Sequence, residues 1–500
     1  MNQISEVTEI AAQERFLQSL ETLKHRAIKS VFWVALTKFA GQGMTWAVTI
    51  WLMRILSPKD YGLMGMAMSY QAIAVILFDL GLGEAIIQKK DLSDEEIDSS
   101  FWFSICFGAF LYLITWFIAE LCAGFYSNQD LTMILRVLGL GIMILSVKEI
   151  PYMLMARHFE FKKRSAGELM SGTGSLLVSL VLALQGYGVW SLVLGQVVGN
   201  LLLTVQTFWV CGWRPRLRFN FGALQRLLKF GVPVTGHYLL SYVCNRSDSV
   251  IIGRFLGDRS LGFYSVAMDL ARTPIDKMIT IVNKVSFPVF AEIQNNPKEL
   301  GRYLLKLVSL TSLVCFPILV GMLMISKEII MLILSEKWMA SLDVFRIFCI
   351  LVIFQTHAGL FVIVLKALGK TSDVLKYSLW SALLLPMAFL AGTRFDLIGV
   401  GLSWLIVYPV LFAYLLYKVF SELDLRITEY GKSLRTAFTG SLFMAVFVMI
   451  GKRYLLGGSI SIATMTICII IGICTYVGYI CLFSREVFGD LKQIVRMVRG

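Results

Sequence analysis

Long runs of hydrophobic residues follow one another along almost the whole chain, and short polar stretches separate them. A helix needs about 20 apolar residues to cross the hydrocarbon layer of a membrane, whereas the strands of a membrane barrel would show alternation. The pattern therefore predicts an all-α integral membrane protein with about 14 transmembrane helices. The predicted spans lie at about residues 30–53, 61–86, 100–124, 131–155, 167–185, 188–211, 230–253, 261–283, 303–325, 342–365, 374–392, 397–418, 434–451 and 459–483.

A segment that begins at the end of the first predicted span is repeated 200 residues later, at the end of the seventh span. Residues 54–68 read RILSPKDYGLMGMAM, and residues 254–268 read RFLGDRSLGFYSVAM. A second echo joins residues 135–137 to residues 345–347 at the start of the fourth and tenth spans. Since six spans separate the copies, the repeat predicts two six-helix lobes in the same orientation, followed by two C-terminal helices. The identical pairs of the first echo are Arg54/Arg254, Leu56/Leu256, Gly62/Gly262, Ala67/Ala267 and Met68/Met268.

This repeat divides the chain into six predicted parts. They are a cytoplasmic amphipathic N-terminus (1–29), an N-lobe with spans one to six (30–211), a basic cytoplasmic linker (212–229), a C-lobe with spans seven to twelve (230–421), spans thirteen and fourteen (422–484) and a cytoplasmic tail (485–500).

Charge is scarce and unevenly placed. The chain has 57% hydrophobic and 16% charged residues, against about 25% charged in a soluble domain. Most Lys and Arg residues outside the spans lie before span one, after even-numbered spans or in the tail, so both termini are predicted to be cytoplasmic. The net charge of +13 is thereby explained without a nucleic-acid partner. The densest basic cluster is expected to contact anionic lipid headgroups, and it consists of Arg214, Arg216, Arg218, Arg226 and Lys229.

A few polar and ionisable residues fall inside predicted spans, where they are costly and normally face protein or water. Asp269, Arg272 and Asp276 are spaced i, i+3 and i+7, so they share one face of span eight. We interpret them as the wall of a water-filled cavity for an anionic, hydroxyl-rich cargo, in which arginine binds phosphate. The alternative is internal pairing, for example of Asp269 with Arg272, that only neutralises charge. The other cavity candidates are Lys38 in span one and Asn245, Arg246 and Asp248 in span seven.

Signals for catalysis, metals and cofactors are weak. The nine cysteines lie mostly in apolar runs without CxxC spacing, and the chain contains no Walker motif for nucleotide binding. The acidic residues between positions 91 and 98 are interpreted as a solvated cytoplasmic loop. We therefore expect a protein that is not an enzyme and uses no cofactor.

Several motifs resemble one family of transporters. Residues 78–88 read FDLGLGEAIIQ, residues 245–257 read NRSDSVIIGRFLG, and residues 287–290 read FPVF. With the 54–68 segment, these resemble the polysaccharide-transporter flippases of the multidrug/oligosaccharidyl-lipid/polysaccharide (MOP) exporter superfamily. The resemblance implies a multi-pass protein of the bacterial inner membrane that flips undecaprenyl-pyrophosphate-linked oligosaccharide to the periplasmic leaflet for capsule, exopolysaccharide or lipopolysaccharide O-antigen synthesis. It further implies alternating access driven by an H⁺ or Na⁺ gradient, and partners among the polysaccharide polymerase and export machinery.

Two other functions remain open. A MATE-like drug/cation antiporter shares the six-plus-six plan, although twelve spans would be more usual there. A membrane polymerase or ligase would act on the same lipid-linked sugars, but such an enzyme is expected to have a long periplasmic loop. The longest such loop here, about residues 326–341, is short and lacks an obvious catalytic constellation.

Overall fold

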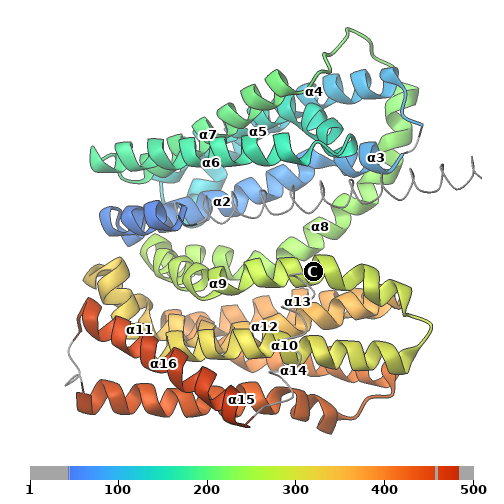
Figure 1. Ribbon diagram of the computed structural model, residues 1–500. Coiled ribbons are helices and arrows are strands. Elements are labelled where there is room, and N and C mark those ends of the chain that lie inside the picture. The colour runs from blue at the N-terminus through green and yellow to red at the C-terminus, as the bar shows by residue number, and fades with distance from the viewer. Residues whose placement is uncertain (1–42, 44, 90, 456–459, 484–500) are drawn as a thin grey trace, which may run out of the picture. The chain divides into compact units, whose positions relative to one another are not determined.

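Helices form nearly all of the chain in the computed structural model (Figure 1), which describes residues 43, 45–89, 91–455 and 460–483. No strand occurs in these ranges. The long helices are α2 (Pro58–Asp79), α4 (Asp94–Tyr126), α5 (Asp130–Arg157), α6 (Phe161–Leu184), α7 (Val189–Val210), α8 (Phe221–Phe255), α9 (Gly257–Glu292), α10 (Pro297–Met324), α12 (Leu342–Ala367), α13 (Thr371–Gly392), α14 (Asp396–Leu423), α15 (Ile427–Ile450) and α16 (Ile462–Phe483). Short elements are α3 (Leu82–Gln88), α11 (Ser326–Glu328), η1 (Ile329–Leu334), η2 (Glu336–Ser341), η3 (Thr393–Phe395) and η4 (Gly451–Leu455).

Ten helical segments of the described chain are long and apolar enough to cross a membrane, which confirms an all-helical membrane protein. One of them, residues 371–423, contains both α13 and α14. The helices α8 and α9 are not among the ten. Each predicted span from the third onward nevertheless falls on one long helix. The first span lies largely outside the described residues, so the count of fourteen stays a prediction.

The second predicted span is not one continuous helix. The helix α2 ends at Asp79, and α3 begins at Leu82. Between them Leu80 and Gly81 adopt left-handed backbone conformations, with φ of 43° and 64°. Glycine has no Cβ to clash in this region, so it readily accepts such a turn. The prediction of an unbroken helix over 61–86 is therefore wrong at this point.

The chain forms two compact units that are not consecutive halves of the sequence. Unit 1 comprises residues 1–52, 78–113 and 137–231, and unit 2 comprises residues 53–77, 114–136 and 232–500. The chain passes from one unit to the other inside α2, α4, α5 and α8. The lobe boundaries expected from the repeat stay a prediction.

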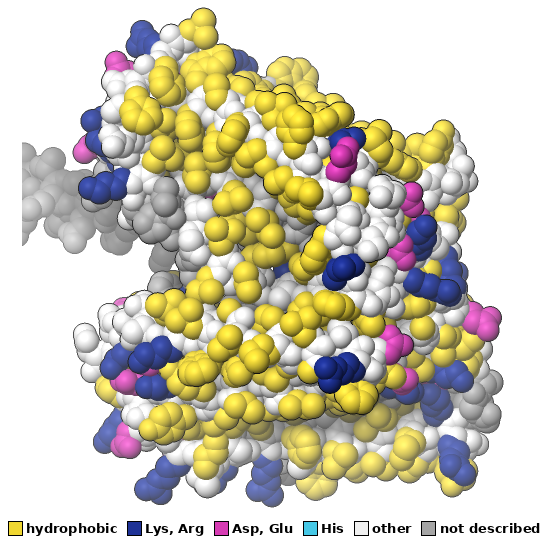
Figure 2. All heavy atoms as spheres, turned by 180° about the vertical axis from the view of Figure 1, so that it is seen from behind, with side chains coloured by type: hydrophobic (Ala, Val, Ile, Leu, Met, Phe, Trp, Pro, Cys, Tyr) yellow, Lys and Arg dark blue, Asp and Glu magenta, His cyan; other side chains and the backbone are white. Residues whose placement is uncertain are grey.

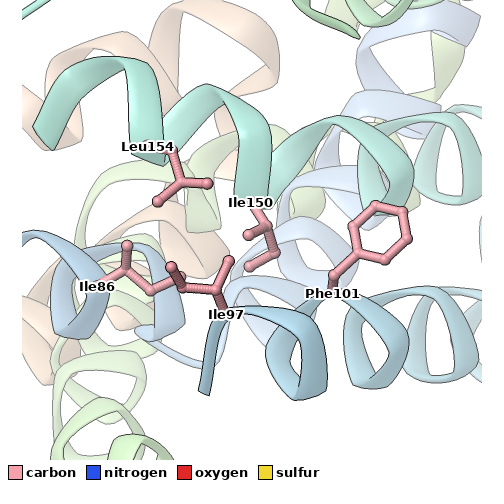
Figure 3. Close-up of a cluster of buried hydrophobic side chains, with 5 residues drawn as sticks. All are labelled: Ile86, Ile97, Phe101, Ile150 and Leu154. Carbon is pink, nitrogen blue, oxygen red and sulfur yellow. The ribbon is translucent and has the colours of Figure 1, made fainter. Parts of the chain in front are cut away.

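The core of unit 1 gathers side chains from α3, α4 and α5. Ile86, Ile97, Phe101, Ile150 and Leu154 are all buried and point toward one another (Figure 3). Trp102, Phe208 and Trp213 pack around them, and Phe101 meets Trp213 edge to face with ring centroids 5.4 Å apart. This cluster fixes the end of α7 against the start of α4.

In unit 2 the helix α12 is the central element, packing against α9, α10 and α14, while α13 packs along α14. The last two helices, α15 and α16, pack on each other and on α10. Large hydrophobic side chains remain exposed on many helices, and they cover much of the face seen in Figure 2, where charged side chains are sparse. Such a surface suits a hydrocarbon solvent.

A candidate substrate cavity in unit 2

A cavity of about 470 Å³ lies among α9, α12, α13 and α14 in unit 2. Its size is within the range of small-molecule pockets. The polar and aromatic side chains that line it are Arg272, Asp276, Asn283, Gln355, Tyr377, Ser378, Ser381, Trp404 and Tyr408.

The helix α9 contributes one face to this cavity. Arg272, Asp276, Ile279 and Asn283 are spaced i, i+4, i+7 and i+11, so they follow one another along the same side of the helix. The structure thus places two of the three charges predicted on this face at the cavity wall. The third, Asp269, is exposed and does not line the cavity.

Arg272 is held by an amide group rather than by a carboxylate. Its Nε and Nη2 donate to Gln355 Oε1 on α12 at 3.1 Å and 2.8 Å. Within the described residues it forms no ion pair with Asp or Glu, so its pairing with Asp269 is not observed. Because a guanidinium carries five N–H donors, this arrangement leaves the positive charge and further donors for a ligand in the cavity.

The other polar groups of the wall suit hydroxylated ligands. Asn283 Oδ1 is buried and accepts no hydrogen bond from the described residues, and an unsatisfied buried acceptor is costly until a donor reaches it. Ser381 donates to the Tyr377 carbonyl oxygen at 2.8 Å, and its hydroxyl oxygen stays an acceptor. Trp404 and Tyr408 lie with their ring centroids 5.8 Å apart at the cavity wall.

Asp248 belongs to a buried network instead of the cavity wall. The Tyr264 hydroxyl donates to Asp248 Oδ2 at 2.7 Å, and Trp404 Nε1 donates to the Tyr264 oxygen at 2.8 Å. Asp248 is 3% exposed, and Ser249 N–H donates to its other oxygen. The three side chains thereby tie α8, α9 and α14 together.

The remaining predicted residues are only partly placed. Arg246 is exposed on α8, and the structure describes the backbone of Asn245 but not its side chain. Lys38 lies outside the described residues. Arg246 is not among the residues that line the cavity.

Sequence reasoning missed Gln355, Asn283 and the aromatic residues of the wall. The sequence could have identified Gln355 as a candidate, because it is a polar side chain within the apolar run at 342–365. Asn283 stands at the end of the predicted span, and tyrosines are too common in membrane helices to stand out. Only the packing of α9, α12 and α13 brings these residues together.

In unit 1 the acidic loop and the basic linker bind each other. Glu96, in the first turn of α4, is 1% exposed and accepts from Lys89 and from Arg226, whose Nη2 lies 3.2 Å from Glu96 Oε1. The Arg216 backbone N–H donates to Asp98, and Trp102 Nε1 donates to the Arg216 carbonyl oxygen. The interpretation of residues 91–98 as a solvated loop is therefore wrong for Glu96 and Asp98, which are each 1% exposed, and residues 94–98 begin α4.

The fold is shared with solved transporters. The structure aligns with an inward closed conformation of the lipid II flippase MurJ with a TM-score of 0.74 and 15% sequence identity, over 91% of this chain and 100% of that one. An inward-facing MATE family multidrug transporter aligns with a TM-score of 0.57 and 14% identity, over 76% of this chain and 95% of that one. The chain therefore shares the fold of these solved membrane proteins.

The sequence identifies the family more narrowly. The model of the polysaccharide biosynthesis protein family matches residues 51–343, more than half of the chain, and the chain belongs to this family. A relative is the lipopolysaccharide biosynthesis protein WzxC of Escherichia coli (strain K12), which is 24% identical over 393 residues, 77% of this chain and 79% of that protein.

Proposed function

We propose that the chain is a flippase that carries an undecaprenyl-pyrophosphate-linked oligosaccharide repeat unit from the cytoplasmic to the periplasmic leaflet of a bacterial inner membrane. The observation that carries the proposal is the position of Arg272 at the cavity wall of a polysaccharide biosynthesis protein, where it forms no ion pair with a described carboxylate. Such an arginine suits a phosphate group, to which it donates two parallel hydrogen bonds.

The physical problem that this cargo poses is its head group. Sugars and pyrophosphate cannot cross about 30 Å of hydrocarbon unaided, whereas the lipid tail can stay in the bilayer. A cavity inside the transporter that opens alternately to the two sides solves this problem. An H⁺ or Na⁺ gradient would supply the energy.

The cavity suggests a division of roles. Arg272 binds the pyrophosphate, while Asn283 and Ser381 hydrogen-bond sugar hydroxyls. A volume of about 470 Å³ admits only part of the head group.

The other candidate residues have separate roles. Arg246 provides a second positive charge, and Asp269 and Asp276 bind the coupling cation or sugar hydroxyls. We assign Asp248 to holding helices together. Lys38 and Asn245 remain candidates for cargo contact.

The orientation follows from the loops. The excess of Lys and Arg in the loops on one side favours a cytoplasmic location for both termini, and the cargo then enters from the side on which it is assembled. The polysaccharide polymerase and export machinery would then act on the opposite side.

Deletion of the gene tests the function. The deletion strain should lose its surface polysaccharide and accumulate the lipid-linked glycan, measured by mass spectrometry of lipid extracts. Complementation with Arg272→Ala or Arg246→Ala should leave the accumulation in place. Arg302→Ala, an exposed arginine on α10 outside the cavity, is the matched control and should restore export.

Other outcomes would contradict the proposal. Normal polysaccharide with new drug sensitivity in the deletion strain would indicate an antiporter. Glycan that has crossed to the outer leaflet but stays unpolymerised would indicate a polymerase or ligase. Normal export by both arginine variants would exclude their phosphate role.

A further inference from the structure

A hollow with two opposite charges lies in unit 1, where the basic linker (212–229) passes from α7 to α8. Its volume is about 580 Å³, and it is lined by Glu95 of α4 and by the consecutive residues Arg218, Phe219, Asn220, Phe221 and Gly222. Glu95 and Arg218 are both exposed, yet they form no ion pair with each other. Among the described residues, the Arg218 guanidinium has no hydrogen-bond acceptor either. The hollow therefore offers one positive and one negative group to a ligand.

Hydrogen bonds hold the backbone of this hollow against the start of α4. The Arg216 backbone N–H donates to Asp98 Oδ1 at 3.2 Å, and the Asn220 backbone N–H donates to Ser99 Oγ at 2.8 Å. The Asn220 amide also donates to Glu95 Oε2 at 3.3 Å, which leaves the other oxygen of this carboxylate without a partner in the described part of the chain. The hollow is thus formed before a ligand arrives, and a preformed site loses less conformational entropy on binding.

Large apolar side chains at and beside the hollow are exposed. Leu217, Phe219 and Phe221 are 88%, 57% and 64% exposed. Trp209, in the last turn of α7, is 85% exposed, and tryptophan is enriched at the head-group level of membranes. Because α7 is long and apolar enough to cross a membrane, the linker that follows it begins at the membrane–water interface. At this level the exposed apolar side chains can contact the acyl chains of a lipid whose head group lies in the hollow.

The two charges determine which head group fits. Arginine donates parallel hydrogen bonds to a phosphate, and a carboxylate accepts hydrogen bonds from an ammonium group. A head group that carries only a phosphate would bring a second negative charge close to Glu95. A trimethylated ammonium has no N–H to donate, whereas a primary ammonium has three. A phosphate joined to a primary amine therefore matches both Arg218 and Glu95.

We propose that this hollow binds a membrane phospholipid with a phosphoethanolamine head group. Arg218 binds its phosphate, Glu95 binds its primary ammonium, and the acyl chains lie against Phe219 and Phe221. The neighbouring carboxylate of Asp94 is already paired with Arg216, 3.2 Å away, so Glu95 is the acidic group that receives the amine. The ligand is a lipid of the surrounding membrane and not the cargo, so the inference does not depend on the proposed function.

Lipid binding to the purified full chain tests the assignment. Delipidated protein in detergent should bind dioleoylphosphatidylethanolamine roughly tenfold more tightly than dioleoylphosphatidylcholine, measured by native mass spectrometry, because only the primary amine donates to Glu95. Arg218→Gln should weaken the binding of both lipids, whereas Glu95→Gln should abolish only the difference between them. Arg302→Gln and Asp91→Asn remove the same charges at exposed positions outside the hollow, so they are the controls and should bind normally. Equal affinity for the two lipids, or a preference that survives Glu95→Gln, would overturn the proposal.

Two further measurements locate the lipid and test for a soluble ligand. A photoreactive phenylalanine analogue in place of Phe219, in nanodiscs with equal amounts of the two lipids, should label mainly the phosphatidylethanolamine. The same analogue in place of Phe438, an exposed residue of α15 in unit 2, should label both lipids equally. Glycerophosphoethanolamine has the head group without acyl chains and should not displace the lipid at equal concentration.

Three results of these measurements would overturn the proposal. Equal labelling of the two lipids at position 219 would remove the specific site. Displacement by glycerophosphoethanolamine would show that the ligand is a soluble zwitterion. Tighter binding of dioleoylphosphatidylglycerol than of the phosphatidylethanolamine would show only a general attraction between the basic linker and anionic lipids.

Discussion

Lys452 places its Nζ 2.7 Å from Glu328 Oε1 and joins η4, which follows α15, to the short helix α11. Glu328 is 1% exposed, and the same ammonium lies 3.4 Å from the Met324 carbonyl oxygen at the end of α10. The pair therefore fastens the C-terminal helices to the end of α10.

Removal of one partner should destabilise the protein. Lys452→Met leaves the buried Glu328 carboxylate without its counter-charge, which costs about 3–5 kcal/mol for a buried pair. The double variant Lys452→Met/Glu328→Gln should recover most of the loss, because no unpaired charge remains. Thermal unfolding in detergent, followed by intrinsic fluorescence, measures both. Equal losses in the single and double variants would show that the pair contributes through packing alone.

His357 should act as a structural residue of α12. It is 2% exposed, and its ring nitrogens lie 2.9 Å from Ser312 Oγ on α10 and 2.9 Å from the Tyr430 hydroxyl on α15. His357→Leu leaves both hydroxyls without this partner and should cost about 1–3 kcal/mol, seen as a lower unfolding temperature. His158→Leu, at an exposed position, should leave the unfolding temperature unchanged.

Glu96 should protect the basic linker from proteases. Glu96→Gln weakens the contacts of Lys89 and Arg226 and should loosen the segment 212–220 from α4. Trypsin should then cleave faster after Arg216 or Arg218, with the products identified by mass spectrometry. Asp91→Asn removes an exposed charge nearby and serves as the control. Unchanged cleavage in Glu96→Gln would mean that the backbone contacts of Arg216 suffice.

Asp248 should tolerate loss of its charge. The amide oxygen of Asp248→Asn can still accept from the Tyr264 hydroxyl, while its NH2 group replaces the oxygen that accepts from Ser249 N–H, so we expect near-normal export and only a small loss of stability. Asp248→Leu leaves Tyr264 without its acceptor and should lower the unfolding temperature. Loss of export in Asp248→Asn at an unchanged unfolding temperature would instead place Asp248 in the transport cycle.

The helices were predictable because hydrophobic runs of membrane length have one explanation. The shared face of Arg272 and Asp276 followed from helical spacing alone. What the sequence could not supply was contact between segments far apart in the chain. Gln355 as the partner of Arg272 depends on how α12 packs against α9, and the burial of Glu96 depends on the return of the linker at Arg226. The helix break at Leu80 could not be predicted, because two turn residues hardly change the hydrophobicity of the sequence around them.

A Cβ built on Gly62 would lie 1.7 Å from the Asp258 carbonyl oxygen, and a Cβ built on Gly262 would lie 1.9 Å from the Pro58 carbonyl oxygen. Because residues 58 and 62 correspond to residues 258 and 262 in the repeat, this contact is reciprocal, which bears on the origin of the chain. When residue i of one copy meets residue j of the other, and j meets i in return, the contact has the form of an isologous interface between identical subunits. Two copies of a half-length ancestor could make this contact as a homodimer before their sequences were fused. Gly62 and Gly262 would then derive from one ancestral glycine, which was encoded by a single codon and occupied both sides of the dimer interface.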